Sequence, residues 1–497
     1  CQSYNSLRTR FHWVRIKSTI RNFANFGLWI QRNARAALAF GNFKTAINKL
    51  MELSIIFFLL YIAVAVIVGV VSSKKETEDD FMIAERKVQG VQVAATMSAS
   101  SFDGATLAIY LAYVYQYGFS AIWLFVGIAV GFLFVRKYAW KIKQRADELK
   151  VYSMPEYFFR VFGKRNGLMF SLFIVLQFFL LLTVNFIVSG KVLSAIFPIP
   201  YFLAVIIGGL IILTYLLLAG FKAVVRTDFF QVIIMFIMTL SVGIFLFGKA
   251  DIPISEFNLG TLGIGNILGF LILAGVGIMA APDLWQRIFA TKDEQNLKRG
   301  LNYSAVILLI LGVVISIVGL ATKQLFPNIV PEDALVTGFS HLLPFGLKEF
   351  GMVLLYAVAL SSSDTATFVI SSIFTRDLKN YSQRYSKESM KKLTRFFMIL
   401  FIALAVLIGI FYQNILALGF SLASLCLALF PVIFGSLYWK LKQRAVFWSL
   451  VLGFVSILVL FVTNQLNPEN AVISLPVVLF SLLIFQKLFR VEPAVTV

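Results

Sequence analysis

The sequence has few of the residues that hold transition metals or build disulfide frameworks. Only two cysteines, Cys1 and Cys426, and two histidines occur in 497 residues. They form no Cys/His cluster, so the pattern argues against a transition-metal centre and against a disulfide framework. A membrane enzyme would need a constellation of this kind, so enzymatic catalysis is not expected. Charged residues are also scarce, at 14%, whereas soluble domains carry about 25%.

Acidic residues are missing from the first 50 positions, which hold nine Lys and Arg. The first methionine is Met51, directly before the first apolar run. We interpret 1–50 as upstream sequence read in frame, with translation starting at Met51; a basic, acid-free targeting segment is the alternative. Because this segment carries nine of the 44 basic residues, the net charge of +20 does not predict a nucleic-acid partner.

Hydrophobic residues make up 59% of the chain and gather in long runs. A helix needs about 20 apolar residues to cross roughly 30 Å of hydrocarbon, and most of the runs approach or exceed this length. They are apolar on every face, which favours helices over a barrel. We therefore predict an all-α, polytopic protein of the lipid bilayer. Thirteen spans are predicted, at 55–72, 89–117, 120–138, 168–195, 201–219, 229–247, 265–283, 301–321, 350–374, 394–411, 414–434, 445–463 and 471–489.

The basic residues of the loops alternate from one side to the other. If the residues before the first span lie outside, the inside loops hold 31 Lys and Arg, and the outside loops hold only Lys249, Lys323 and Lys348. Cytoplasmic loops carry the excess of basic residues in membrane proteins. The pattern predicts a multi-pass protein of the plasma (inner) membrane, with its amino end outside and its carboxyl end in the cytoplasm.

Two spans contain the signals of an interrupted helix. The second has a polar cluster between Thr96 and Thr106, and the seventh is rich in glycine and then contains Pro282. Transporters bind solute and ions where helices are broken near the membrane midplane. The two spans are five apart, as inverted five-helix repeats of spans 2–6 and 7–11 require. Small residues that only permit close helix packing are the alternative explanation.

The ninth span carries a second polar cluster, SSSDTAT, between Ser361 and Thr367. An isolated Ser or Thr in a membrane helix usually bonds to the preceding turn of backbone. So dense a cluster, with a carboxylate at membrane depth, is better explained by a polar cavity or an ion site. Sodium is a hard cation that prefers oxygen ligands, which hydroxyl groups and freed carbonyls supply.

Four stretches resemble one family. TMSASSFDG matches a Ser-Ala-x-x-Phe-x-Gly signature at Ser98, Ala99, Phe102 and Gly104. AGFKAVVRTDFFQ (219–231), WQRIFATKDEQNLKRG after span seven and SSSDTATFVISSIFTRDL in span nine match further signatures in the same order. The chain resembles the sodium/solute symporter family, whose members import sugars, proline, pantothenate and similar solutes. The resemblance spans roughly 51–489 and implies sodium as the coupling ion and alternating access.

The resemblance implies a sodium site between spans two and nine. Its ligands would be the backbone carbonyls of Ala94, Met97 and Val358 and the hydroxyl groups of Ser361 and Ser362. Asp364 and Thr365 correspond to positions at which some members bind a second ion. Asp228 matches the signature aspartate at the inner end of span six, where either a gating role or a structural ion pair is expected.

The solute is expected among the broken helices. The candidate residues are Ser98, Ser101, Asp103, Ser120, Gly275 and Gly277. Sugar-carrying members have an Asn-Gln pair near the break of span seven, whereas this chain has Ala281 and Pro282. A small polar organic solute that resembles an amino acid is therefore favoured over a sugar. Asp103 is not part of the signature; it would face the amine of a solute or a second ion, or have a structural role.

These observations divide the chain into four parts. They are the basic segment 1–50, the first span and its loop at 51–88, the transport core at 89–434, and two accessory spans with a short tail at 435–497. The leading hypothesis is sodium-coupled solute import. The alternatives are proton coupling through Asp103 or Asp364 and a transporter-like membrane sensor.

Overall fold

The computed structural model describes residues 53–64, 88–151, 153–197, 199–219, 236–247, 251–381 and 387–489. Within these ranges every regular element is a helix, and the only strand-like contact is an isolated bridge between Val88 and Thr291. The predicted all-α class is therefore confirmed for the described part. The segment 1–50, most of the loop after the first span, and Asp228 lie outside it.

Among the described residues, eight helical segments are long and apolar enough to cross a membrane, or nine if one bent pair is counted as a span. The described residues also contain three shorter apolar helices, Leu53–Val64, Tyr201–Thr214 and Phe236–Phe247, which fall in predicted spans one, five and six. α5 (Gly104–Tyr117), η2 (Gly118–Ile122) and α6 (Trp123–Val135) follow one another as one continuous run. A multi-pass membrane protein is thus confirmed, while the count of thirteen stays a prediction.

The second predicted span is interrupted between α4 (Gly90–Ser101) and α5. Phe102 leaves the helical conformation with φ −119° and ψ 55°, and Asp103 follows in an extended conformation. The Asp103 carboxylate accepts a hydrogen bond from the Thr106 amide at 2.7 Å. Aspartate is a favoured residue at this position because it satisfies an amide that the new helix leaves free. The predicted break is present at these two residues.

The seventh predicted span is interrupted as well. α11 (Ile264–Gly277) leads through η4 (Ile278–Ala280) into α12 (Pro282–Ala290), and the two halves bend by 52°. Ala281 is extended, and Pro282 is the first residue of α12. Proline suits this position because the missing N–H would have had no partner in the helix. Both predicted interruptions are therefore found, whereas the inverted repeat itself stays a prediction.

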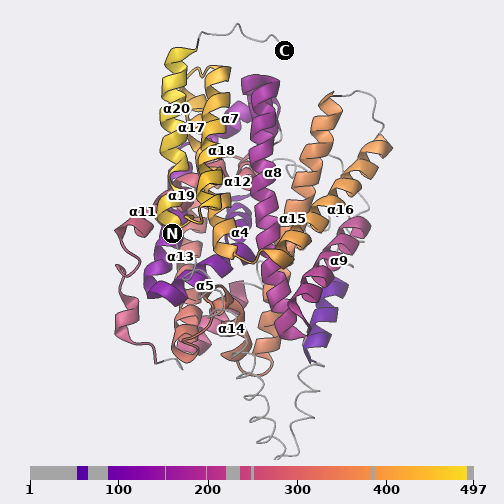
Figure 1. Cartoon of the computed structure of the whole chain (residues 1–497), viewed down its shortest axis with the longest axis vertical. Helices are drawn as coiled ribbons and strands as arrows, with labels where there is room; N and C mark the ends of the chain where they lie inside the picture. Colours follow the sequence, from indigo (N-terminus) through magenta and orange to yellow (C-terminus); the bar gives the residue numbers. More distant parts are fainter. Residues whose placement is uncertain are drawn as a thin grey trace, which may run out of the picture. The chain divides into compact units, whose positions relative to one another are not determined.

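The helices pack in two groups, and most of their members are labelled in Figure 1. In the first, which we name the α13 group, α4, α5 and α6 pack against α13 (Glu294–Leu325), and α11 packs against α6. In the second, the α15 group, α8 (Met154–Ile196), α9 (Tyr201–Ala219), α15 (Leu347–Tyr381) and α16 (Lys387–Phe411) pack against one another. α17 (Ile415–Tyr438), α18 (Gln443–Val462) and α20 (Ser474–Leu488) lie together beside α8.

Glycines bring α6 and α11 into close contact. A Cβ atom at Gly131 would lie 2.6 Å from the carbonyl oxygen of Gly275, and one at Gly127 would lie 2.7 Å from that of Phe270. Glycines four residues apart on one helix face allow two membrane helices to approach until their backbones touch. Gly275 therefore has the packing role that was the alternative explanation for the glycines of span seven.

We predict that Gly131→Ala destabilises the protein, because the new methyl group has no space against the α11 backbone. Overpacking of this kind costs about 1–3 kcal/mol. The melting temperature in detergent measures it. Gly208→Ala on α9 is the matched control, since its Cβ atom would meet nothing nearer than 3.6 Å. The helical preference for Ala over Gly should keep or raise the melting temperature of that variant. Equal melting temperatures for the two variants would contradict the prediction.

Candidate functional site

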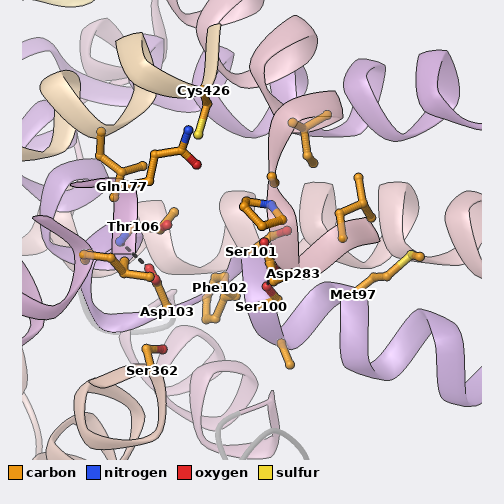
Figure 2. Close-up of a pocket in the computed structure, with 18 of the residues that line it drawn as sticks. Met97, Ser100, Ser101, Phe102, Asp103, Thr106, Gln177, Asp283, Ser362 and Cys426 are labelled. Atoms are coloured by element: carbon orange, nitrogen blue, oxygen red, sulfur yellow. Dashed lines mark hydrogen bonds between the residues drawn. The ribbon is translucent and has the colours of Figure 1, made fainter. Parts of the chain in front are cut away.

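A cavity of about 510 Å³ lies where the two interrupted helices meet α8, α15 and α17 (Figure 2). Its polar wall includes Ser101 and Asp103 at the first break, Asp283 at the second, and Gln177 on α8. The rest of the lining is mostly apolar and includes the rings of Phe178, Phe270 and Phe420. A pocket of this size with a few polar groups in an apolar wall is typical of a site for a small organic ligand.

The polar residues of α15 separate onto two faces. The hydroxyl groups of four of them donate to the carbonyl four residues earlier, at 2.6–2.7 Å, and all four are buried: Ser363, Thr367, Ser371 and Thr375. Another face lines the cavity: Val358, Ser361, Ser362, Thr365 and Ser372. Backbone bonding therefore explains the first set. Ser372 of the second set also donates to the Val369 carbonyl, at 2.9 Å, but this set lines the cavity and is therefore placed to meet a ligand.

The residues expected at the sodium site lie on two walls. Met97 on α4 and Val358, Ser361 and Ser362 on α15 line the same cavity. Ala94 does not line it, and its carbonyl oxygen accepts a hydrogen bond from the Ser304 hydroxyl of α13 at 3.2 Å. This bond follows from the packing of α4 on α13. The structure thus brings four of the five expected positions to one cavity.

The remaining expected residues are divided between the cavity and the surrounding packing. Thr365, Ser101, Asp103 and Gly277 line the cavity. Ser98 and Asp364 are buried but do not line it, and the Asp364 carboxylate accepts a hydrogen bond from the Thr365 amide at 2.6 Å. Ser120 also lies elsewhere: its hydroxyl donates to the Leu259 carbonyl at 2.7 Å and so joins η2 to the segment before α11. Gly275 packs against α6.

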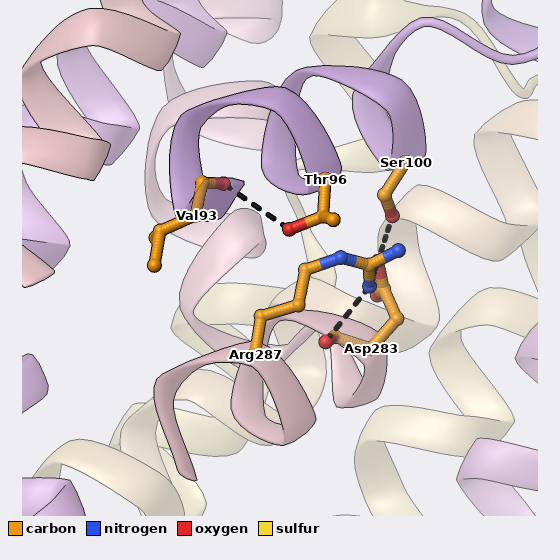
Figure 3. A network of polar contacts seen from close by, with 5 residues as sticks. All are labelled: Val93, Thr96, Ser100, Asp283 and Arg287. Atoms are coloured by element: carbon orange, nitrogen blue, oxygen red, sulfur yellow. Dashed lines mark hydrogen bonds and ion pairs between the residues drawn. The ribbon is translucent and has the colours of Figure 1, made fainter. Parts of the chain in front are cut away.

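Two ionisable residues of the cavity were not predicted, Asp283 and Arg287 on α12. The Arg287 guanidinium contacts the Asp283 carboxylate at 3.1 Å and its backbone carbonyl at 2.9 Å. The Ser100 hydroxyl of α4 donates to the same carboxylate (Figure 3). The two broken helices are therefore joined directly. The sequence offered one signal for this pair, since the Pro-Asp at the start of α12 is typical of a helix amino terminus.

The amino end of α4 is hydrogen-bonded to the end of α12 and the start of α13. The Val88 amide donates to the Ala290 carbonyl at 3.1 Å, the Lys292 amide donates to the Val88 carbonyl at 3.1 Å, and the Gly90 amide donates to the Asn296 side chain at 2.9 Å. The buried Lys143 of α7 (Ala139–Leu149) donates to the Phe289 carbonyl at 2.9 Å and so caps the end of α12. α4 and α12 are thus held together at both ends.

Gln177 was also missed by the sequence reasoning. It is 3% exposed, and neither its amide nitrogen nor its amide oxygen has a hydrogen-bond partner in the described part of the protein. Figure 2 shows it on the same side of the cavity as Thr106 and Asp103. A single glutamine in an apolar membrane helix is a weak signal in sequence, because the apolar run around it gives no indication of which face meets a cavity.

Residues 81–453 match the sodium:solute symporter family. The chain belongs to this family. Its coupling ion is accordingly sodium, and a cavity lined by hydroxyl groups and broken helices is where that ion and its solute can meet. The motif at 219–231, which contributed to the resemblance, lies mostly outside the described residues.

Curated relatives agree with this assignment. The osmoregulated proline transporter OpuE of Bacillus subtilis is 26% identical over 83% of this chain and 90% of its own length. The sodium/pantothenate symporter of Haemophilus influenzae is 26% identical over 82% of this chain and 90% of its own length. These relatives are transporters for small organic solutes.

Solved structures share the fold. A Na+-coupled sialic acid symporter in a substrate-bound outward-open state superposes with a TM-score of 0.76 at 19% identity, covering 90% of this chain and 99% of that one. MHP1, a nucleobase-cation-symport-1 family transporter, superposes with a TM-score of 0.51 at 14% identity, over 83% and 95% of the two chains. At these identities the likeness establishes a transporter fold and nothing about the solute.

We predict that Gly104→Ala weakens sodium binding. A Cβ atom at Gly104 would lie 2.8 Å from the Asn185 side-chain oxygen and 3.0 Å from the Ala359 Cβ atom, so the added methyl group pushes the first turn of α5 away from α8 and α15. Sodium raises the melting temperature of a protein that binds it only when folded. This rise should be smaller in Gly104→Ala. Gly277→Ala is the control on the same cavity, because its Cβ atom would meet nothing nearer than 3.8 Å. An unchanged sodium response in Gly104→Ala would contradict the prediction.

Proposed function

We propose that the protein imports a small, amino acid-like organic solute together with sodium across the plasma membrane by alternating access. The observation that carries the proposal is the cavity itself: two interrupted helices and the hydroxyl face of α15 line one space. Unwound segments at membrane depth expose carbonyls and helix ends, which are the groups that bind ions and polar solutes. The relatives named for proline and pantothenate support a small organic solute.

The donor set fits sodium. Ser361, Ser362 and Thr365 offer hydroxyl oxygens from α15, and the last turn of α4, which directly follows Met97, has backbone carbonyls without helical partners. These are oxygen ligands without excess charge, which suit a hard monovalent cation. We assign Met97, Val358, Ser361 and Ser362 to the main site. Ala94, Asp364 and Thr365 are kept as further proposed ligands, with Asp364 and Thr365 at a second ion.

We also propose that the cavity of this structure opens toward the cytoplasm and that the amino end lies outside. Beyond Ser362 and Asp283 the cavity wall continues to Ser372 on α15 and to Ala290 at the end of α12, and the loops that follow both helices are basic. At the proposed outer ends of the helices, two ion pairs join neighbouring elements. Lys191 of α8 contacts Asp333 at 2.6 Å, and Lys323 of α13 contacts Glu256 at 2.7 Å. The excess of basic loop residues supports a cytoplasmic opening, with the amino end outside and the carboxyl end inside.

The remaining sequence-based expectations belong to the same proposal. The transport core is 89–434, preceded by the first span and loop at 51–88 and followed by two accessory spans at 435–497. The solute would bind beside Ser101, Asp103 and Gly277, whereas Ser98, Ser120 and Gly275 would support the surrounding helices. Asp228 is retained as a gating residue at the inner end of span six.

The decisive experiment measures uptake of a labelled panel of amino acids, sugars, carboxylates and vitamins into proteoliposomes with and without an inward sodium gradient. We expect accumulation of at least one amino acid-like solute only with the gradient. Ser362→Ala should raise the sodium concentration for half-maximal uptake about tenfold. The lost hydroxyl ligand should weaken the free energy of sodium binding by about 1.4 kcal/mol, which is similar to the contribution of one hydrogen bond. Ser363→Ala is the matched control, since its hydroxyl is bonded to the Ala359 carbonyl at 2.7 Å and not to the cavity. Uptake that follows pH and ignores sodium would replace sodium by proton coupling.

A second prediction concerns the cytoplasmic opening. In a protein with Cys1 and Cys426 replaced by serine, Ser372→Cys should react with a membrane-impermeant thiol reagent in inside-out vesicles and not in right-side-out vesicles. The cavity wall reaches Ser372, so the reagent can enter from that side. Ser371→Cys is the control, because that residue is fully buried on the backbone-bonded face. Labelling of Ser372→Cys only in right-side-out vesicles would contradict the proposed cytoplasmic opening.

A further inference from the structure

The charged side chains that line the cavity do not cancel. Among the described lining residues they are Asp103, Asp283 and Arg287. Asp283 and Arg287 form an ion pair at 3.1 Å, and Asp103 has no ion-pair partner in the described part of the chain. Asp103 is 5% exposed. A carboxylate at membrane depth is costly unless a cation or a hydrogen-bonding ligand meets it, so the cavity is built to receive positive charge.

Asp103 keeps acceptor capacity for such a ligand. One of its carboxylate oxygens accepts the Thr106 amide at 2.7 Å, and this bond fixes the side chain at the start of α5. A carboxylate has about four lone-pair positions, so the cap leaves positions for a donor in the cavity. Figure 2 shows Asp103 between Thr106 and Ser362, with Gln177 on the same side.

Gln177 supplies the second half of a site. Its side chain is 97% buried, lines the cavity, and has neither its donor nor its acceptor satisfied by the described residues. Buried amides are almost always hydrogen-bonded, so an orphaned one aimed at a cavity indicates a ligand. The amide oxygen can accept from an amine, and the amide NH2 can donate to a carboxylate. A bare sodium ion could use only the oxygen.

We propose that Asp103 and Gln177 form a subsite for the protonated amine of the solute, so that the protein carries amino or imino acids and rejects carboxylates that have no amine. This inference rests on the proposed function. The ammonium group meets Asp103 and the Gln177 oxygen, and the Gln177 NH2 group donates to the solute carboxylate. Sodium on the α15 wall offsets the charge of Asp103, so a zwitterion leaves the cavity neutral. An anion without an amine would add an unpaired negative charge close to Asp103, and this repulsion is the basis of selectivity.

The apolar lining of the cavity narrows the class of solute further. Phe178, Leu181, Phe270 and Phe420 line the cavity together with the subsite. These side chains offer no hydrogen bonds to hydroxyl groups, so the part of the solute beyond its amine and carboxylate is a compact hydrocarbon chain or ring.

The test uses the full chain in proteoliposomes and records sodium-dependent currents on solid-supported membranes. Solutes are supplied in pairs that differ only in the amine: proline and cyclopentanecarboxylate, leucine and 4-methylpentanoate, alanine and propionate. We expect a current from at least one amino or imino acid and no current from the matching carboxylate that lacks the amine. Asp103→Asn keeps the helix cap and the side-chain volume but removes the charge. It should raise the half-saturating concentration of the amine-bearing solute at least tenfold, and Gln177→Met should raise it severalfold.

Asp293→Asn is the matched control. Asp293 caps α13 through the Asn296 amide at 2.8 Å, as Asp103 caps α5, but it does not line the cavity. Hydrogen bonds from the backbone amide and from the side chain of Asn296 lower the pKa of Asp293, so Asp293 carries a negative charge. Asp293→Asn therefore also removes a charge. It should leave the half-saturating concentration unchanged. The rise of melting temperature with sodium should persist in Asp103→Asn and so show that this variant is folded.

Four outcomes would overturn the amine subsite. They are equal currents from a carboxylate and its amino acid, an unchanged half-saturating concentration in Asp103→Asn, a panel without any current, and an Asp103→Asn defect in sodium dependence alone. The last would assign Asp103 to a second cation. Failure of the proposed function has a different signature, which is solute current that persists when sodium is replaced by choline.

Discussion

Backbone polar groups at membrane depth must find partners inside the protein or in a water-filled cavity, and this constraint organises the whole structure. Two helices are interrupted there, at Phe102 and Asp103 and at Ala281. The breaks are tolerated because Asp103 caps the new helix and Pro282 begins the other without an N–H group to satisfy. Residues on both sides of each break line a shared cavity. Solute and ion sites follow from that geometry, because the same unsatisfied groups that would be costly in lipid are ligands in a cavity.

The two groups of helices give the cavity its walls. α4 is bonded to α12 and α13 through Val88, Gly90 and Ser100, while α15 packs on α8. The sodium donors that we assign therefore lie on both helix groups, Met97 on α4 of the α13 group and Ser361 and Ser362 on α15 of the α15 group. Movement of one unit against the other would change the distance between these donors, which links ion binding to the opening of the cavity. Within the α13 group, glycines bring the backbones of α6 and α11 into close contact.

The family assignment and the cavity chemistry answer different questions. The match over 81–453 identifies a sodium:solute symporter and says little about which solute is carried. We propose that the solute is bound by two residues that are not among the matched signature positions. They are Asp103, which has no ion-pair partner in the described part, and Gln177, whose amide has no hydrogen-bond partner there. Fold and coupling ion are properties of the scaffold, whereas selectivity depends on a few polar side chains placed in an apolar wall.

The sequence by itself determined the all-helical membrane class, the two broken helices and the span that carries the hydroxyl cluster. Hydrophobic length, glycine, proline and polar clusters act along the chain, so they can be read without knowing what packs against what. Only the tertiary structure decided which members of those clusters meet the cavity. Ser362 and Ser363 are neighbours in one run of serines, yet one lines the cavity and the other bonds to its own helix. Ala94 and Gly275 pack against other helices, and Gln177 joins the site. The reason is that a helix's rotation about its axis is set by the neighbours it packs against, and local sequence does not encode that angle.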